Sequence, residues 1–345
     1  MKRYGKRLVS VALVMVMLLT MLPTSASELN GLDIQNQIVS DELLGVMGVN
    51  YEELVSGDYE DSGDTYSCII WIEDIDMERA VRAGIDAAEM TRTTYSMNRE
   101  YEYPYEVMDV NGQKVVEVNL AEDENDTYVQ TYINAERASA AEMYADKNGE
   151  FVADTFSART ASVNYVSSYS PCVFADLTVD EVAELLAKDE VQRIGYWNEE
   201  NASVDANSSD SFTSEELGDL TTHLDIIRVD EAQSVYGVSG SGIRIGQIEP
   251  GCPIETTVVK RTGYSTDDHS NMVYTIMSRV APNATYYAAS GDTDSNYRSG
   301  IEWMIGQGVN VINCSSGWKV TGNNINVYDE RSRWIDHITY NHDVH

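Results

Sequence analysis

The fold is decided by residues 285–317, which read TYYAASGDTDSNYRSGIEWMIGQGVNVINCSSG. Residues 285–289 and residues 309–314 are short apolar runs rich in aromatic or β-branched side chains, a pattern typical of buried strands. Between them, residues 296–306 have apolar side chains at helical spacing. A strand, a helix and a second strand in this order predict a right-handed βαβ unit on a parallel sheet.

The same alternation extends in both directions from this unit. We expect a strand at residues 243–248, a helix at residues 269–280 and, after the unit, a helix at residues 329–340. The last helix would lead into another central strand near His345, and without that strand the sheet would have an exposed edge. The sequence therefore predicts an α/β parallel-sheet domain that is incomplete as the sequence stands.

Upstream, residues 67–197 predict a smaller domain of another kind. Residues 28–66 are acidic and weakly periodic, so we expect loop with one short helix there. Strands are expected at residues 67–73, 171–175 and 191–197, and helices at residues 77–90, 129–147 and 179–187. Thr178 and Glu181 form a capping box ahead of the last helix. Long connections between strands favour an α+β domain with an antiparallel sheet.

Charge separates the chain into regions. The chain has 57 acidic and 23 basic residues, a formal net charge of −34, and most of the excess lies in residues 28–220. Such a charge repels a polyanion, which argues against a nucleic-acid partner. Residues 201–214 read NASVDANSSDSFTS and have no apolar periodicity, as expected of a linker. The expected boundaries are 1–27, 28–200, 201–222 and 223–345.

The N-terminus has the pattern of a secretory signal peptide. Basic residues up to Arg7 precede the apolar run Leu8 to Leu22, and small residues follow up to Ser27. A membrane anchor is the alternative, but the apolar run is shorter than the about 20 residues that a bilayer requires. We therefore expect a secreted, extracellular protein with no membrane association after signal removal.

Four widely spaced cysteines are present, and no CxxC motif occurs. An exported protein could pair them in two disulfides, but their apolar, strand-like settings favour buried free thiols. They are Cys68, Cys172, Cys252 and Cys314.

Cofactor motifs are weak throughout. Gly240 and Gly242 precede their strand instead of following it, so a dinucleotide-binding fingerprint is not supported. The segment from Asp292 to Asn296 begins like a calcium loop but lacks the sixth-position Gly, and Trp303 occupies the place of the last carboxylate. We expect no cofactor and a solvated loop here, with calcium as the open alternative.

Three polar segments follow strands or open a helix, at the sheet edge where parallel sheets place their ligands. Glu249 follows residues 243–248, His269 opens the next helix, and Ser315 to Gly317 follow residues 309–314. A carboxylate, an imidazole and an exposed polar strand end are the skeleton of a nucleophilic hydrolase site.

These segments resemble the subtilisin-like serine proteases. GSGIRIGQIEPG (240–251) resembles the acid-bearing segment of that family, and DHSNMVYTIMSRVAPNATYYAA (268–289) resembles its histidine helix and next strand. SGIEWMIGQGVNVINCSSG (299–317) resembles the helix and substrate-binding strand that follow. The likeness covers about residues 223–345, the first half of such a catalytic domain. FADLTVDEVAELLAKDEVQRIGYW (174–197) more weakly resembles the end of the preceding propeptide.

The resemblance implies a role for each site residue. His269 would be the general base, and Ser315, Ser316 and Gly317 would bind an extended peptide substrate. Glu249 stands where the family has Asp, so its carboxylate reaches one methylene further. Misplacement of a catalytic group by about 1 Å can cost about 10²-fold in rate.

The family's oxyanion-hole Asn and nucleophilic Ser lie beyond the segments matched here, and Ser270 and Asn271 replace the usual Gly and Thr after the histidine. The expected function is a secreted serine endopeptidase precursor that hydrolyses peptide bonds in proteins, carries an intramolecular propeptide and is inactive as the sequence stands. The alternatives are a non-catalytic secreted peptide-binding protein and a prodomain-type inhibitor or chaperone. Four further histidines are expected on the surface: His223, His337, His342 and His345.

Overall fold

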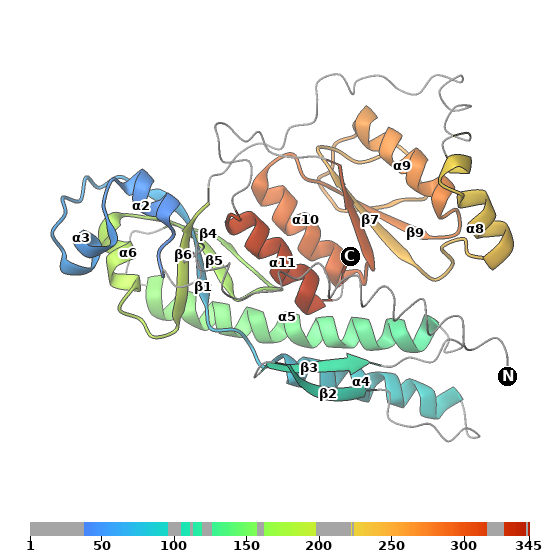
Figure 1. The fold of residues 1–345 in the computed structure, drawn as a ribbon, viewed down its shortest axis with the longest axis horizontal. Coiled ribbons are helices and arrows are strands. Elements are labelled where there is room, and N and C mark those ends of the chain that lie inside the picture. The colour runs from blue at the N-terminus through green and yellow to red at the C-terminus, as the bar shows by residue number, and fades with distance from the viewer. Residues whose placement is uncertain are drawn as a thin grey trace, which may run out of the picture.

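The computed structural model describes residues 38–95, 105–110, 113–118, 126–156, 162–197, 222, 224–315, 328–342 and 344–345. It shows a mixed α/β protein with an antiparallel sheet and a parallel sheet (Figure 1). We call residues 38–197 the N-terminal part and residues 224–345 the C-terminal part. The expected signal peptide, and the expected linker apart from Thr222, lie outside the described residues.

The N-terminal part is built on a four-stranded antiparallel sheet of order β4-β5-β1-β6, as its sequence predicts. Sequence analysis missed β4 and the hairpin of β2 and β3. The strands are β1 (Tyr66–Ile72), β2 (Tyr105–Val110), β3 (Gln113–Val118), β4 (Ser162–Val166), β5 (Cys172–Leu177) and β6 (Val191–Tyr196).

In the described residues of this part, five helices accompany the strands. The capping box of Thr178 and Glu181 is present at the start of α6, as predicted. Residues 28–66 are predicted to hold one helix, but the described residues 38–66 already hold two, and the second begins with a capping box of Asn50 and Glu53. The helices are α2 (Asp41–Met47), α3 (Tyr51–Ser56), α4 (Met77–Tyr95), α5 (Asp126–Phe156) and α6 (Val179–Leu185).

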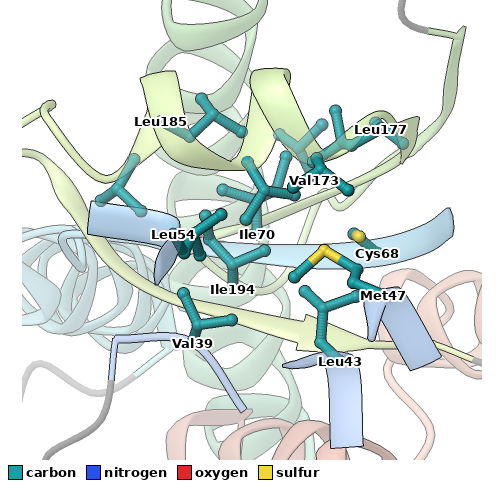
Figure 2. Packing of buried hydrophobic residues seen from close by; sticks show 14 of the residues in the cluster. Val39, Leu43, Met47, Leu54, Cys68, Ile70, Val173, Leu177, Leu185 and Ile194 are labelled. Atoms are coloured by element: carbon teal, nitrogen blue, oxygen red, sulfur yellow. The ribbon is translucent and has the colours of Figure 1, made fainter. Parts of the chain in front are cut away.

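The two faces of the antiparallel sheet carry two different cores. On one face, Ile70, Val173 and Ile194 pack against Leu43 and Leu185, and none of these five side chains is exposed (Figure 2). Alternate strand residues point to the opposite face. There the side chains of Ile69, Trp71 and Phe174 belong to a cluster shared with the C-terminal part.

The C-terminal part contains a parallel sheet of order β10-β7-β9-β8, which confirms the α/β expectation. β10 begins two residues later than expected because Gly308, with a φ of +70°, makes the turn out of the preceding helix. The strands are β7 (Arg244–Glu249), β8 (Val259–Lys260), β9 (Thr285–Ser290) and β10 (Val311–Cys314). The helices are α8 (Val229–Tyr236), α9 (Asp268–Val280), α10 (Asp294–Gly306) and α11 (Glu330–His342).

The last residues of the sequence lie against the outer edge of β10. The Ile312 N–H donates to the His345 carbonyl at 2.7 Å, and the His345 N–H donates to the Asn310 carbonyl at 3.1 Å. These are bonds of the kind that a parallel neighbour makes, and they lie where the sequence predicts a further strand.

α10 and α11 lie between the two sheets (Figure 1), and their side chains pack against the N-terminal part. The Glu330 carboxylate accepts hydrogen bonds from Trp71 Nε1 at 2.9 Å and Arg193 Nε at 2.6 Å. It lies over Gly195, where a Cβ atom would come 2.3 Å from Glu330 Cδ. Arg137 of α5 donates to the His342 carbonyl at 2.7 and 3.0 Å, so it caps the C-terminus of α11.

The surface position expected for His337 and His342 is wrong. His342 has no exposed surface, and its Nε2 lies 2.5 Å from the Tyr169 carbonyl oxygen. The side chain of His337 is only 13% exposed. Both side chains lie on the face of α11 that the N-terminal part covers. His345 is exposed as expected, and His223 lies outside the described residues.

Among the residues that the structure describes, no helix combines the length and the apolar character needed to cross a membrane.

Candidate functional site

The structure brings Glu249 and His269 together at the carboxyl edge of the parallel sheet. Glu249 is the last residue of β7, an inner strand, and His269 lies in the first turn of α9. His269 Nε2 lies 3.2 Å from Glu249 Oε2. The Glu249 side chain is fully buried and that of His269 is 11% exposed. The predicted juxtaposition of acid and imidazole is therefore present.

The first turn of α9 is fixed by polar contacts that orient His269. Asp267 caps the helix by accepting the Ser270 N–H at 3.0 Å. The buried Ser270 hydroxyl donates to the Gly251 carbonyl at 2.8 Å, and Gln247 Nε2 donates to the Ser270 carbonyl at 2.9 Å. A Cβ atom on Gly251 would come 2.6 Å from Asp267 Cβ, so only glycine fits there. Ser270, which stands where the family named in the resemblance has Gly, thus helps to hold the helix start against β7.

The other oxygen of Glu249 contacts the end of β10. Oε1 accepts the Ser315 N–H at 2.7 Å and Asn313 Nδ2 at 3.3 Å. Asn313 Nδ2 also donates to Ser315 Oγ at 2.8 Å. Sequence analysis missed Asn313, whose only signal is a polar residue inside an otherwise apolar strand.

Burial dominates the electrostatics of this pair. It raises the pKa of Glu249 above its usual value, while the Ser315 N–H and His269 oppose the rise. The Glu249 charge also affects Tyr297 of α10. Burial, Cys314 and Glu249 together raise the pKa of the Tyr297 hydroxyl. A carboxyl group whose charge is disfavoured, beside an imidazole, is suited to exchanging a proton.

The orientation of the imidazole differs from that of a serine-protease triad. In a triad the acid contacts Nδ1 and leaves Nε2 for the serine. Here Nε2 faces the acid, and Nδ1 is buried with no hydrogen-bond partner. The contact of His269 Nε2 with Glu249 Oε2 is close, but its geometry falls short of a hydrogen bond. Both ring nitrogens are thus left without a hydrogen bond in this arrangement.

The structure describes only part of the expected peptide-binding segment. Ser315 is exposed, and its N–H is engaged by Glu249. Ser316 and Gly317 lie outside the described residues. Cys314 is exposed, which corrects the expectation that all four cysteines are buried; the other three are buried, and none of the four forms a disulfide.

The segment with a partial calcium pattern begins a helix instead of forming a loop. Thr293 caps α10 by accepting the Asn296 N–H, and Asp294 pairs with Arg331 at 2.8 Å. Asn296 Nδ2 donates to Asp292 Oδ1 at 2.8 Å. Within the described ranges, no three His, Cys, Asp or Glu side chains are grouped so that they could hold a metal ion.

A cleft of about 1170 Å³ lies between the antiparallel sheet and α11. Its four charged side chains already have partners: Arg193 and Arg333 contact Glu330, Asp74 accepts from the Tyr144 hydroxyl, and Asp336 accepts from the Tyr328 hydroxyl. We therefore regard the site at Glu249 and His269 as the stronger candidate for chemistry.

No family model matches this sequence, and no curated protein matches it significantly. The chemistry of the site must accordingly be inferred from its own geometry.

Proposed function

We propose that this chain is the precursor of a secreted, subtilisin-like serine endopeptidase, with a signal peptide, an acidic propeptide, a linker and the first half of the peptidase domain. The observation that carries the proposal is the buried pair of Glu249 and His269 at the carboxyl edge of the parallel sheet. An acid and an imidazole in contact there, beside an exposed strand end, are two members of a nucleophilic hydrolase site.

In this proposal His269 takes the proton of a serine hydroxyl and later gives it to the leaving amine. Glu249 orients the imidazole and stabilises its charged form. The ring must first turn so that Nδ1 faces Glu249 and Nε2 becomes available to the serine. Ser315, Ser316 and Gly317 bind the substrate peptide as an added strand. No cofactor takes part, and the substrates are peptide bonds in proteins.

The nucleophile belongs, by resemblance, to a segment beyond those matched in this sequence. The chain on its own is therefore expected to be inactive, because a base without its nucleophile cannot form an acyl-enzyme.

The contacts between the two parts support the propeptide role of the N-terminal part. Glu302 of α10 accepts hydrogen bonds from the Tyr165 hydroxyl at 2.8 Å and the Ser168 N–H at 2.9 Å. Trp334 of α11 donates to Ser170 Oγ at 3.1 Å. A domain held on two helices of the peptidase part by such bonds could guide its folding or restrain it.

The same contacts favour the second candidate, a non-catalytic peptide-binding protein or a prodomain-type inhibitor or chaperone. Over the described residues, His269 makes no hydrogen bond to a serine hydroxyl. In that case the interface with α10 and α11 would be the functional feature and the acid–imidazole pair a remnant.

An activity comparison distinguishes the candidates. Residues 28–345 and a version extended through any reading frame after codon 345 are assayed with casein and with a serine-directed fluorophosphonate probe. The proposal predicts no labelling of residues 28–345 and labelling of the extended form that His269→Ala abolishes. Circular dichroism confirms that the variant folds. An extended form that neither labels nor cleaves casein would reject the peptidase in favour of the second candidate.

A further inference from the structure

The two carboxylate oxygens of Glu249 contact different groups. Oε2 faces His269 at 3.2 Å, while Oε1 is held at the end of β10 by the Ser315 N–H and the Asn313 amide. The carboxylate therefore spans from its own strand, β7, to the neighbouring strand and to α9 at once.

This span uses the full length of a glutamate. The backbone of Glu249 is fixed by pairing with Ser290 of β9, and the adjacent Ile248 pairs with Cys314 of β10. The Gly291 N–H also donates to the Glu249 carbonyl at 2.6 Å. An aspartate on the same backbone would end about 1.5 Å short, one C–C bond. It could not reach both the Ser315 N–H and His269.

Asn313 is the second hydrogen-bond donor to Glu249 Oε1. Its Nδ2 contacts Glu249 Oε1 at 3.3 Å and Ser315 Oγ at 2.8 Å, so one amide ties the carboxylate to the residue whose N–H also binds it. The other described groups that act on the carboxylate, His269 and the Tyr297 hydroxyl, carry no permanent positive charge. The direction of Glu249 is set by two hydrogen-bond donors, the Asn313 amide on β10 and the N–H of Ser315 just after it.

We propose that the acid position of this site is built for glutamate, and that Asn313 is the positioning residue that aims the Glu249 carboxylate at His269. The inference rests on the proposed function only in taking His269 as the group that exchanges protons. It reverses the simple expectation that an aspartate, the family's residue, would improve the site.

Histidine and glutamate NMR signals of the full secreted chain test the proposal. The ¹⁵N signals of His269 report which ring nitrogen carries the proton, and the Glu249 carboxyl ¹³C signal reports its titration. Glu249→Asp should shift the His269 signals to those of Glu249→Ala. Asn313→Asp has the same shape but replaces a donor with a carboxylate, so it should raise the pKa of Glu249 above the wild-type value and change the His269 signals.

Asn310→Asp is the matched control. Asn310 lies just before the other end of β10, where its Oδ1 accepts the Arg244 N–H at 2.9 Å, an interaction that an aspartate retains. It should leave both readouts at their wild-type values. If Asn313→Asp does not fold, Asn313→Ala should still raise the pKa of Glu249, by loss of one donor.

Wild-type His269 signals in Glu249→Asp, or equal changes in Asn313→Asp and Asn310→Asp, would overturn the proposal. The measurement needs no peptidase activity, so the two proposals can fail separately. If the extended chain is inactive but shows the expected NMR shifts, only the peptidase proposal is rejected. If the extended chain is active but lacks those shifts, only the positioning role of Asn313 is rejected.

Discussion

Glu249 and Glu330 are both buried carboxylates, but they differ in whether both of their oxygens have hydrogen-bond partners. Glu330, at the start of α11, is bound by Arg193 and Trp71 of the antiparallel sheet, with both oxygens engaged. At the edge of the parallel sheet, Glu249 Oε2 and both ring nitrogens of His269 lack a hydrogen bond. Buried polar atoms are nearly always paired, so the exceptions require an explanation.

Under the proposed function, Glu330 holds the fold while Glu249 and His269 are available for chemistry. Removing one partner of a buried ion pair destabilises the fold, because the other charge is left without compensation. A carboxylate with both oxygens engaged has no atom left to bind another group. An acid and an imidazole that are close but unsatisfied can still bind a third group. Contacts between the two parts should therefore dominate stability, and the acid–imidazole pair should contribute little.

The largest effect is expected at Arg137. Arg137→Met removes donors from the carbonyl oxygens of His342 and Val309 and leaves those oxygens buried. Hydrogen bonds to charged groups contribute about 1.5–3 kcal/mol each, so the free energy of unfolding should fall by about 3 kcal/mol or more. Urea unfolding measures it. Arg79→Met, at an exposed position on α4, is the control. Equal changes in the two variants would show that the cap contributes nothing.

A smaller, pH-dependent effect is expected at His342. Burial lowers its pKa to about 3, against about 6.5 for an unfolded histidine, with Arg137 and His337 adding to the shift. The unfolded state thus binds more protons, and His342 should reduce stability as the pH falls from about 6.5 toward 3. The slope is at most about 1.4 kcal/mol per pH unit.

His342→Asn should lose this component of the pH dependence. Unfolding measured from pH 7 to pH 4 in the wild type, in this variant and in His345→Asn gives the difference directly. His345 is exposed and serves as the control. A wild-type slope in His342→Asn would mean that the buried imidazole is not responsible.

The acid–imidazole pair was predicted from strand order and the family resemblance, and most of the elements from local patterns, which depend on neighbours in sequence. The βαβ order, the capping box at Thr178 and the helix that begins beside His269 are examples. Contacts between distant residues left no such signal. Arg137 binds a carbonyl 205 residues away, and no periodicity in α11 shows that His342 faces the N-terminal part.

Asn313 was missed for a related reason. A polar residue inside a strand has no local signature of function, and its role depends on Glu249, 64 residues earlier. The exposure of Cys314 could not be predicted either, since strand alternation does not tell which end of the strand is covered.

The most direct test of the central claim compares Glu249→Gln with Glu330→Gln in the free energy of unfolding at pH 7. Because burial raises the folded-state pKa of Glu249, its ionisation at neutral pH opposes folding, and glutamine should change stability by no more than about 1 kcal/mol, or increase it. Glu330→Gln breaks a buried ion pair with Arg193 and should cost about 3 kcal/mol. If Glu249→Gln destabilises the protein as much as Glu330→Gln does, the acid at the sheet edge is a structural residue and the account is wrong.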